Sequence, residues 1–113
     1  MDYLTIGRDV IRRVFREYER LDNRRPTPGL YTSVVFDDER GHYMLITRGW
    51  ECEHRVKNLF LYVRIHDGKF WVEEDWSEDG IANHLLKAGV PKDKIVLAFQ
   101  PPKTREMGEF ALA

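Results

Sequence analysis

The sequence predicts an α+β domain with an N-terminal helix, a four-stranded antiparallel meander, a second helix and a final buried strand in the same sheet. Three features support this: a helical period of apolar residues near the N-terminus, a two-residue period in the middle, and a short apolar run after a second helical stretch. Helices and strands that do not alternate regularly favour a mainly antiparallel sheet. With 113 residues, the chain is expected to form one domain over residues 1–113.

The first helix is predicted from Tyr3 to Arg24. Apolar residues recur there at steps of three and four, which places them on one face of a helix. They are Tyr3, Ile6, Val10, Val14, Tyr18 and Leu21. The following RPTPGLY contains two prolines and a glycine, which should end the helix.

Four strands are predicted between residues 31 and 75. YTSVVFD (31–37) and HYMLITRGW (42–50) flank a DERG turn and should pair as a hairpin. The segment KNLFLYVRIHDGKFWVEED (57–75) contains a clear apolar and polar alternation. Its Asp67-Gly68 pair is typical of a two-residue type I′ turn, so we expect a second hairpin there.

The second helix is expected to begin after Ser77, which can act as the N-cap. Glu78 and Asp79 would then lie at the positive end of the helix dipole. Gly89 can supply a left-handed C-terminal residue, and Pro91 forbids continuation. The apolar run KIVLAF predicts a final strand buried on both faces, and EFALA ends the chain with Phe110 and Leu112 available for docking.

Five carboxylates precede or open the second helix, and they raise the question of a metal or acid–base site. They are Glu73, Glu74, Asp75, Glu78 and Asp79. Strand alternation should turn Glu73 and Asp75 to one side of the sheet and Glu74 to the other. A helix cap and a solvated strand end explain these residues without a metal, so we favour that interpretation over a metal-dependent enzyme.

The single cysteine, Cys52, excludes an intrachain disulfide and fits a reducing compartment. Cys52, His54 and the earlier His42 do not form the paired pattern of a zinc site. A nucleophilic Cys52 with a distant histidine as base stays open, because that arrangement is spatial. With no phosphate-binding loop or nucleophile elbow in the sequence, we expect no cofactor, no metal, no catalytic residues and no enzyme activity.

The chain has no apolar run long enough to span a membrane and no secretory leader, so we expect a cytoplasmic protein. Lys and Arg total 18 against 19 Asp and Glu, which argues against a strongly basic DNA-binding domain. Arginines four residues apart nevertheless form a strip on the first helix. Of these, Arg12, Arg16 and Arg20 are the candidate nucleic-acid contacts, although a solvated charged face is the commoner outcome.

A sheet with helices on one side leaves its second face open, and that face is the candidate partner-binding surface. The alternation should turn Leu59, Leu61, Val63 and Ile65 toward the helices. Phe60 and Tyr62 would then face outward, and Trp50, Trp71 or Trp76 could join them; of these, Trp71 is taken as a partner-binding residue. The alternative is that the C-terminal tail covers this patch. A homodimer, formed by the sheet face or by edge pairing, is the default oligomeric state.

Several segments resemble the XisI family, the fdxN element excision controlling factors, in order and spacing. They are FDDERGHYMLITRGW, HDGKFWVEED, SEDGIANHLLKAGVPKDKIVLAFQPP and the closing EFALA. The resemblance covers essentially the whole chain and is weakest in the first helix and the RRPTPG link. Gln100 stands before the proline pair, where the family often has histidine.

This resemblance implies an accessory role. XisI-type proteins look like controlling factors that act with a recombinase to excise a DNA element in filamentous cyanobacteria, and they are typically encoded beside a nuclease-like protein, XisH. The family has no established catalytic residues to transfer. The resemblance therefore implies a noncatalytic factor that binds an XisH-like protein and joins a recombinase complex on DNA, with a direct DNA-binding directionality factor as the alternative.

Overall fold

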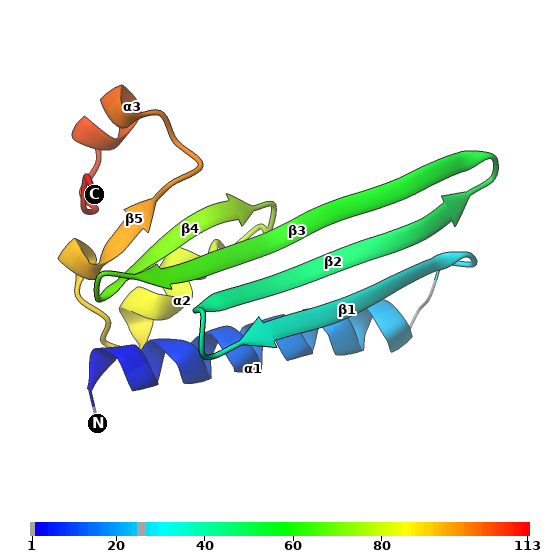
Figure 1. Cartoon of the computed structure of the whole chain (residues 1–113), viewed down its shortest axis with the longest axis horizontal. Coiled ribbons are helices and arrows are strands. Elements are labelled where there is room, and N and C mark those ends of the chain that lie inside the picture. The colour runs from blue at the N-terminus through cyan, green and yellow to red at the C-terminus, as the bar shows by residue number, and fades with distance from the viewer. Residues whose placement is uncertain (1, 25–26) are drawn as a thin grey trace.

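The computed structural model describes residues 2–24 and 27–113. The elements, in chain order, are α1 (Tyr3–Arg24), β1 (Leu30–Asp37), β2 (His42–Glu51), β3 (His54–His66), β4 (Lys69–Asp75), α2 (Ile81–Lys87), the 3-10 turn η1 (Lys92–Lys94), β5 (Ile95–Leu97) and α3 (Pro102–Glu106) (Figure 1). The predicted bounds of the first helix are confirmed. Among the described residues, no helix is both long and apolar enough to cross a membrane.

The five strands form one sheet in the order β1-β2-β3-β4-β5. The first four pair antiparallel as the predicted meander, and β5 pairs parallel to β4 after the chain crosses over through α2. The predicted α+β class and the position of the last strand in the same sheet are therefore confirmed. The last strand has only three residues, shorter than the apolar run suggested.

Helices α1 and α2 lie on one side of the sheet (Figure 1), and the hydrophobic core fills the space between. The helices contribute fully buried residues such as Ile11, Phe15 and Leu85, and the sheet contributes Leu61 and Phe70. The backbone of α1 approaches the sheet closely at Gly7, where an added Cβ would lie 2.1 Å from the ring of Phe70. Glycine at this position allows helix and sheet to pack at that distance.

Two tight turns shape the meander. Asp67 and Gly68 have φ angles of 51° and 71°, as a type I′ turn requires, so this prediction is confirmed. A second two-residue turn, Cys52-Glu53, joins β2 directly to β3, because Glu51 pairs with His54. Strand β3 thus begins before the predicted run that starts at Lys57, and the β2–β3 hairpin reaches beyond β4 (Figure 1).

Two β-bulges reverse predicted side-chain directions. Between the pairs Leu45↔Leu61 and Ile46↔Leu59, β3 carries the extra residue Phe60. The prediction that Phe60 faces away from the helices is wrong: its ring lies 5.7 Å from that of Tyr18 in α1. The same bulge pairs Leu59 with Ile46, next to the core residue Leu45, and so turns Leu59 outward. An inserted residue shifts the alternation by one, which turns the following side chains to the other face.

The second bulge lies in β4, where Glu73 is the extra residue between the pairs Tyr62↔Glu74 and Val63↔Val72. The prediction that Glu73 and Asp75 share one side is wrong for this reason. Asp75 instead lies opposite the buried Leu61 and so points to the side on which α2 lies. The bulge therefore brings a strand carboxylate to a helix end.

The C-terminal segment runs along the outer edge of β5. The N–H of Ala111 donates to the C=O of Ile95 over 2.9 Å, and Lys69 Nζ bonds the C=O of Ala113. Phe110 is half-buried against the core, whereas Leu112 is exposed. The tail and α3 thus lie at the β5 end of the sheet (Figure 1), away from the outward side chains of β1, β2 and the start of β3.

Candidate partner-binding face

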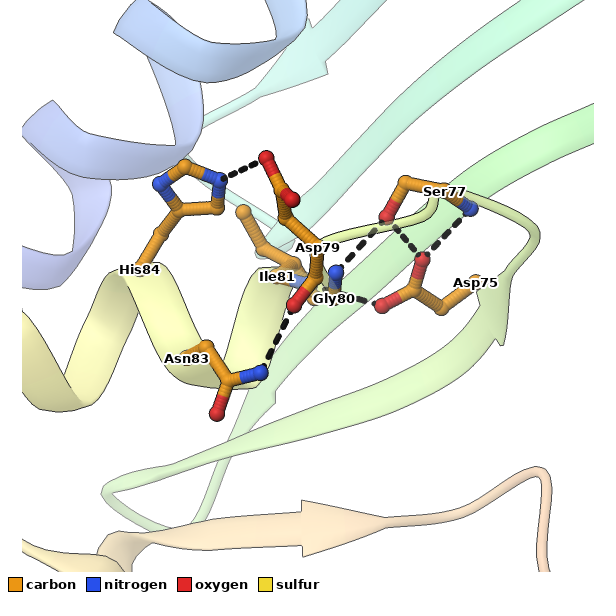
Figure 2. A network of polar contacts seen from close by, with 7 residues as sticks. All are labelled: Asp75, Ser77, Asp79, Gly80, Ile81, Asn83 and His84. Carbon is orange, nitrogen blue, oxygen red and sulfur yellow. Dashed lines mark hydrogen bonds and ion pairs between the residues drawn. The ribbon is translucent and has the colours of Figure 1, made fainter.

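A polar network joins the end of β4 to the start of α2 (Figure 2). Asp75 Oδ2 accepts the N–H of Ile81 at 2.8 Å. Asp75 Oδ1 accepts the N–H of Ser77 at 2.9 Å and also its hydroxyl. Ser77 Oγ in turn accepts the N–H of Gly80 at 3.2 Å. The carboxylate of Asp75 therefore satisfies a free amide in the first turn of α2.

The prediction that Ser77 is the N-cap is wrong. Helix α2 begins at Ile81, and the N-cap position belongs to Gly80, whose φ of 80° strongly favours glycine. Asp79 precedes the helix; its C=O accepts the side-chain amide of Asn83 at 2.7 Å, and its carboxylate lies 3.9 Å from His84 Nε2. The network substitutes for the predicted serine cap because the β4 bulge supplies a carboxylate from the strand.

The five carboxylates singled out in the sequence do not converge. Glu73 Oε1 accepts from Arg64 Nε at 3.1 Å, and Glu74 Oε2 accepts from Trp76 Nε1 at 3.1 Å. Asp75 serves the start of α2, as above. Over residues 2–24 and 27–113, no three His, Cys, Asp or Glu side chains come together so that they could hold a metal ion. Glu73, Glu74 and Asp75 thus stabilise the local structure and do not surround a shared reaction centre.

Among the residues considered for zinc or nucleophilic chemistry, Cys52 and His54 lie together at the β2–β3 turn, whereas His42 lies far from both. Cys52 is exposed at the tip of the β2–β3 turn, with a φ of 57°. His42 lies at the opposite end of this hairpin, where it pairs with Arg64, and its Nδ1 lies 2.7 Å from the hydroxyl of Tyr62. The hairpin thus holds His42 away from Cys52.

The open sheet face is the surface formed by side chains of β1–β4 that point away from α1 and α2. Strand pairing places on it the neighbours Val35 and Met44, Met44 and Tyr62, and Ile46 and Leu59. Its apolar members are Tyr31, Val35, Met44, Ile46, Trp50, Leu59, Tyr62 and Trp71. Tyr31 is 61% exposed, Trp50 is 53% exposed and Val35 is 44% exposed. These exposed fractions leave much apolar area in contact with water.

Tyr62 and Trp71, two of the predicted partner-binding residues, lie on this face among polar groups. The guanidinium of Arg64 lies 5.1 Å from the ring centre of Trp71, whose Nε1 donates to the C=O of His66 at 3.1 Å. Burial, and to a smaller extent the nearby Glu73 carboxylate, raises the pKa of Tyr62. Its phenol therefore keeps its proton near pH 7, and it can donate a hydrogen bond to Nδ1 of His42 when that nitrogen carries no hydrogen.

Of the two most exposed aromatic residues of the open sheet face, Tyr31 was not predicted, and Trp50 was considered as a possible member but not chosen as a site residue. Arg48 stacks over Tyr31 at 5.4 Å, and Arg55 stacks over Trp50 at 5.5 Å. Each arginine lies on the strand next to its aromatic partner. The alternation of Tyr31, Ser33 and Val35 in the sequence could have indicated this end of the face, once β1 was known to be at the sheet edge.

The arginines of α1 have partners within the molecule. Arg12 bonds the carboxylate of Asp38, and Arg20 Nη2 lies 2.6 Å from Glu17 Oε1. The guanidinium of Arg16 lies 5.2 Å from the ring centre of Phe36. All three predicted nucleic-acid contacts thus lie on α1, and the guanidinium of each one already contacts another side chain of the protein.

A groove of about 440 Å³ separates α1 from the start of α2. Val14, Tyr18 and Leu21 are among its lining residues, together with Asp79 and His84. Burial raises the pKa of Tyr18, which keeps this phenol neutral. The charged groups around the groove have mixed signs and do not indicate one class of ligand.

Fold and surface together define the class: a small α+β protein with a mixed five-stranded sheet and with α1 and α2 packed on one face. The chain belongs to the XisI family, whose model, described as XisI protein, matches residues 1–112.

Two solved structures are similar over nearly the whole chain. The crystal structure of the fdxN element excision controlling factor XisI from Anabaena variabilis is 34% identical, with a TM-score of 0.84, and the match covers 99% of this chain and 100% of that one. A XisI-like protein from the same organism is 25% identical, with a TM-score of 0.86 and the same coverage. Among curated proteins, none matches this chain.

Proposed function

We propose that this chain is a noncatalytic controlling factor for excision of a DNA element, and that it acts by binding a protein partner of the XisH type. A 34% identical structure of the same fold is named as an fdxN element excision controlling factor, which supports the role in excision. The open sheet face supports the mode of action, because extended apolar surfaces on small proteins commonly mark association sites.

The exposure of Tyr31, Val35 and Trp50 is the observation on which the proposal depends. Aromatic residues and arginine are enriched where proteins bind each other, and here Arg48 and Arg55 stack on two exposed aromatic rings. These stacked pairs are held in the sheet by strand pairing, so little conformational entropy is lost when a partner covers them.

The proposal is noncatalytic because the candidate reactive groups do not meet at one centre. Asp75 serves the start of α2, Glu73 pairs with Arg64, and Cys52 is exposed at the β2–β3 turn. A general acid and base must lie within reach of one reacting centre. These groups are distributed over three separate places of the fold.

Co-purification with an XisH-type protein tests the proposal. Trp50→Ser with Val35→Ser should weaken the complex at least about tenfold, as loss of buried aromatic and aliphatic contacts does. Leu112→Ser is the matched control, because Leu112 is also exposed, at 56%, but lies in the C-terminal segment. The proposal fails if the two proteins stay separate at micromolar concentration, or if the control weakens binding as much as the double variant.

A homodimer is the second association that the open sheet face can support. Edge pairing through β1 is less favourable, because side chains of α1 already bond two of its outer backbone groups: Glu19 accepts from the N–H of Val34 at 2.8 Å, and Asn23 donates to the C=O of Thr32 at 3.3 Å. Sedimentation of the purified chain at several concentrations tests this, and a dimer that Val35→Ser dissociates is the expected result.

Direct DNA binding through α1 is the weaker candidate, because its arginines already have partners within the molecule. This candidate function predicts an affinity for DNA that falls steeply as the salt concentration rises. The affinity should be lost when Arg16 and Arg20 are both replaced by Glu. Retention on DNA at low salt by the unmodified chain, but not by this double variant, would favour it over the protein-binding proposal.

A further inference from the structure

Within residues 2–24 and 27–113, the sheet has three stretches of backbone edge, and two of them already make hydrogen bonds on their outer side. Glu19 and Asn23 of α1 bond the outer edge of β1, and Ala111 bonds the outer edge of β5. Natural proteins commonly protect sheet edges in this way, because unpaired strand edges attract further strands.

The third edge is the first half of β3. Strand β4 ends opposite Leu61, whereas β3 extends back to His54. The N–H of Trp76 still donates to the C=O of Phe60 at 3.1 Å, and the chain then turns away toward α2. Across residues 2–24 and 27–113, nothing bonds the backbone of residues 54–59 from the side opposite β2. One edge of the sheet is therefore left uncovered.

The geometry of the β2–β3 hairpin identifies which backbone groups point outward. In a two-residue hairpin the flanking pair, here Glu51 and His54, is hydrogen-bonded, and bonded and non-bonded pairs then alternate. Arg55 and Lys57 fall in non-bonded pairs, so their N–H and C=O groups point away from β2. The N–H of Trp50, the partner of Arg55, accordingly turns to the other side and donates to the C=O of Gly29 at 2.9 Å.

A hollow of about 500 Å³ lies beside this edge where β4 leaves off. Its lining includes Lys57, Leu59, Phe60, Glu74 and Trp76. The indole of Trp76 is 73% exposed and is held by its bond to Glu74. An exposed, oriented tryptophan at the end of an unpaired edge is a suitable anchor for an added segment.

Charge indicates what kind of segment fits. Residues 54–59 carry His54, Arg55 and Lys57 and no acid, and no described carboxylate pairs with Lys57. Glu51 and Glu53 lie farther out, at the turn. A second copy of this edge would bring cations opposite cations, which is unfavourable across paired strands. Acidic side chains at alternate positions of an added strand would instead meet Arg55 and Lys57 on one face.

We infer that an extended acidic segment of a partner protein adds to the sheet as a strand beside residues 54–59 of β3. Backbone hydrogen bonds supply affinity, and Arg55, Lys57 and Trp76 supply selectivity. The added strand continues the sheet where β4 ends and covers about 20 Å of β3. The inference rests on the proposed function only in taking a partner protein as the occupant.

Amide hydrogen exchange on the full chain tests the inference without any substitution. The amides of Arg55 and Lys57 should exchange fast in the free chain and at least about tenfold more slowly with a saturating XisH-type protein. The Val34 amide, which Glu19 already binds, is the internal control and should exchange slowly in both. A complex in which the two edge amides stay unprotected overturns the inference while leaving the proposed function intact.

Lys57→Pro and Lys57→Ala form a matched pair of variants. Proline removes an outward N–H that β2 does not use, as edge strands tolerate, whereas alanine removes only the charge. The proline variant should bind at least about tenfold more weakly than the alanine variant. Equal binding by two variants with similar unfolding midpoints overturns the inference. If the proline variant does not fold, the amide hydrogen exchange of Arg55 and Lys57 in the unmodified chain tests the inference instead.

A short peptide of alternating valine and glutamate separates this inference from the proposed function. With the unmodified chain it should shift the amide resonances of Arg55, Lys57 and Trp76, whereas a valine and lysine peptide should not. These shifts would support the inference even if no XisH-type protein binds the chain. If no XisH-type protein binds and the acidic peptide causes no shifts, the inference is overturned. A free chain that dimerises with protected edge amides also overturns it, since the occupant is then a second copy.

Discussion

The carboxylate of Asp75, at the end of β4, accepts a 2.8 Å hydrogen bond from the backbone N–H of Ile81, the first residue of α2. A strand residue thus performs the task usually carried out by a serine, threonine or aspartate at the N-cap itself. The bond ties the last antiparallel strand to the helix through which the chain crosses to β5.

Removing this carboxylate should destabilise the protein. Asp75→Ala leaves the N–H groups of Ile81 and Ser77 without their acceptor, so we expect the free energy of unfolding to fall by about 1–2 kcal/mol. Urea denaturation measures the change. Asp79→Ala is the control, since the Asp79 side chain is 74% exposed and its loss should change stability by less than about 0.5 kcal/mol. Equal effects would contradict the role given to Asp75.

Gly7→Ala should also destabilise the chain, although alanine is normally the better helix former. The added methyl group would overlap the ring of Phe70, which is fully buried and has no room to move aside. Overpacking of this kind lowers stability by about 1–3 kcal/mol. Asp9→Ala, at an exposed position of the same helix, should be nearly neutral. A thermal midpoint for Gly7→Ala at or above that of the unmodified chain would show that helix and sheet are not in close contact there.

The bulge at Phe60 predicts different effects for two residues that simple alternation would place on the same face. Phe60→Ala removes a ring packed against Tyr18 and should lower the free energy of unfolding by about 2–3 kcal/mol. Val35→Ala, on the open sheet face, should change it by no more than about 0.5 kcal/mol. Denaturant titration of both variants measures this, and a Phe60→Ala variant as stable as Val35→Ala would place Phe60 on the open face after all.

Stability should fall at alkaline pH. Burial, followed by the hydrogen bond to Asp38, raises the pKa of Tyr43 in the folded state, whereas an unfolded tyrosine ionises near pH 10. Above about pH 10 the folded state therefore binds more protons than the unfolded state, and the free energy of unfolding decreases as pH rises. The stabilisation is fully present below about pH 10 and is lost as pH rises toward the pKa of the folded state.

Tyr43→Phe isolates this contribution. The variant should lose about 1 kcal/mol at pH 7, because Tyr43 donates a 2.7 Å hydrogen bond to Asp38. Its stability should then depend less steeply on pH above about pH 10 than that of the unmodified chain. Urea titrations at a series of pH values measure both effects, and parallel pH curves for the two proteins would contradict the assignment to Tyr43.

Elements whose conformation depends on residues close in the sequence could be predicted from the sequence. The apolar period from Tyr3 to Leu21 and the following prolines determined α1, and Asp67-Gly68 determined the β3–β4 turn. In both cases the residues that decide the conformation lie within a few positions of it. The order of elements follows as well, because each apolar pattern requires a particular neighbour to cover it.

The partner-binding candidates were predicted less completely. Tyr62 lies on the open sheet face as the alternation indicated, but Phe60 lies on the other side. Trp71 and Trp50, whose sides the alternation did not assign, lie on the open face, and the exposed Tyr31 was not predicted. The strand pattern alone gives no sign of an inserted residue. A bulge can be recognised only from the pairing with the neighbouring strand. For residues beyond an unrecognised bulge, the alternation therefore predicts the wrong face of the sheet.

Local periodicity and backbone preference were enough to predict the α+β class, the span of α1, the meander and the turn residues. The contacts between distant segments were needed to find that Glu73 bulges and that Asp75 thereby reaches α2. They also show that, within the part of the chain that the structure describes, the outer edges of β1 and β5 make hydrogen bonds, whereas that of residues 54–59 of β3 does not. These features depend on contacts between residues that are distant in the sequence, and local sequence preferences do not specify such contacts.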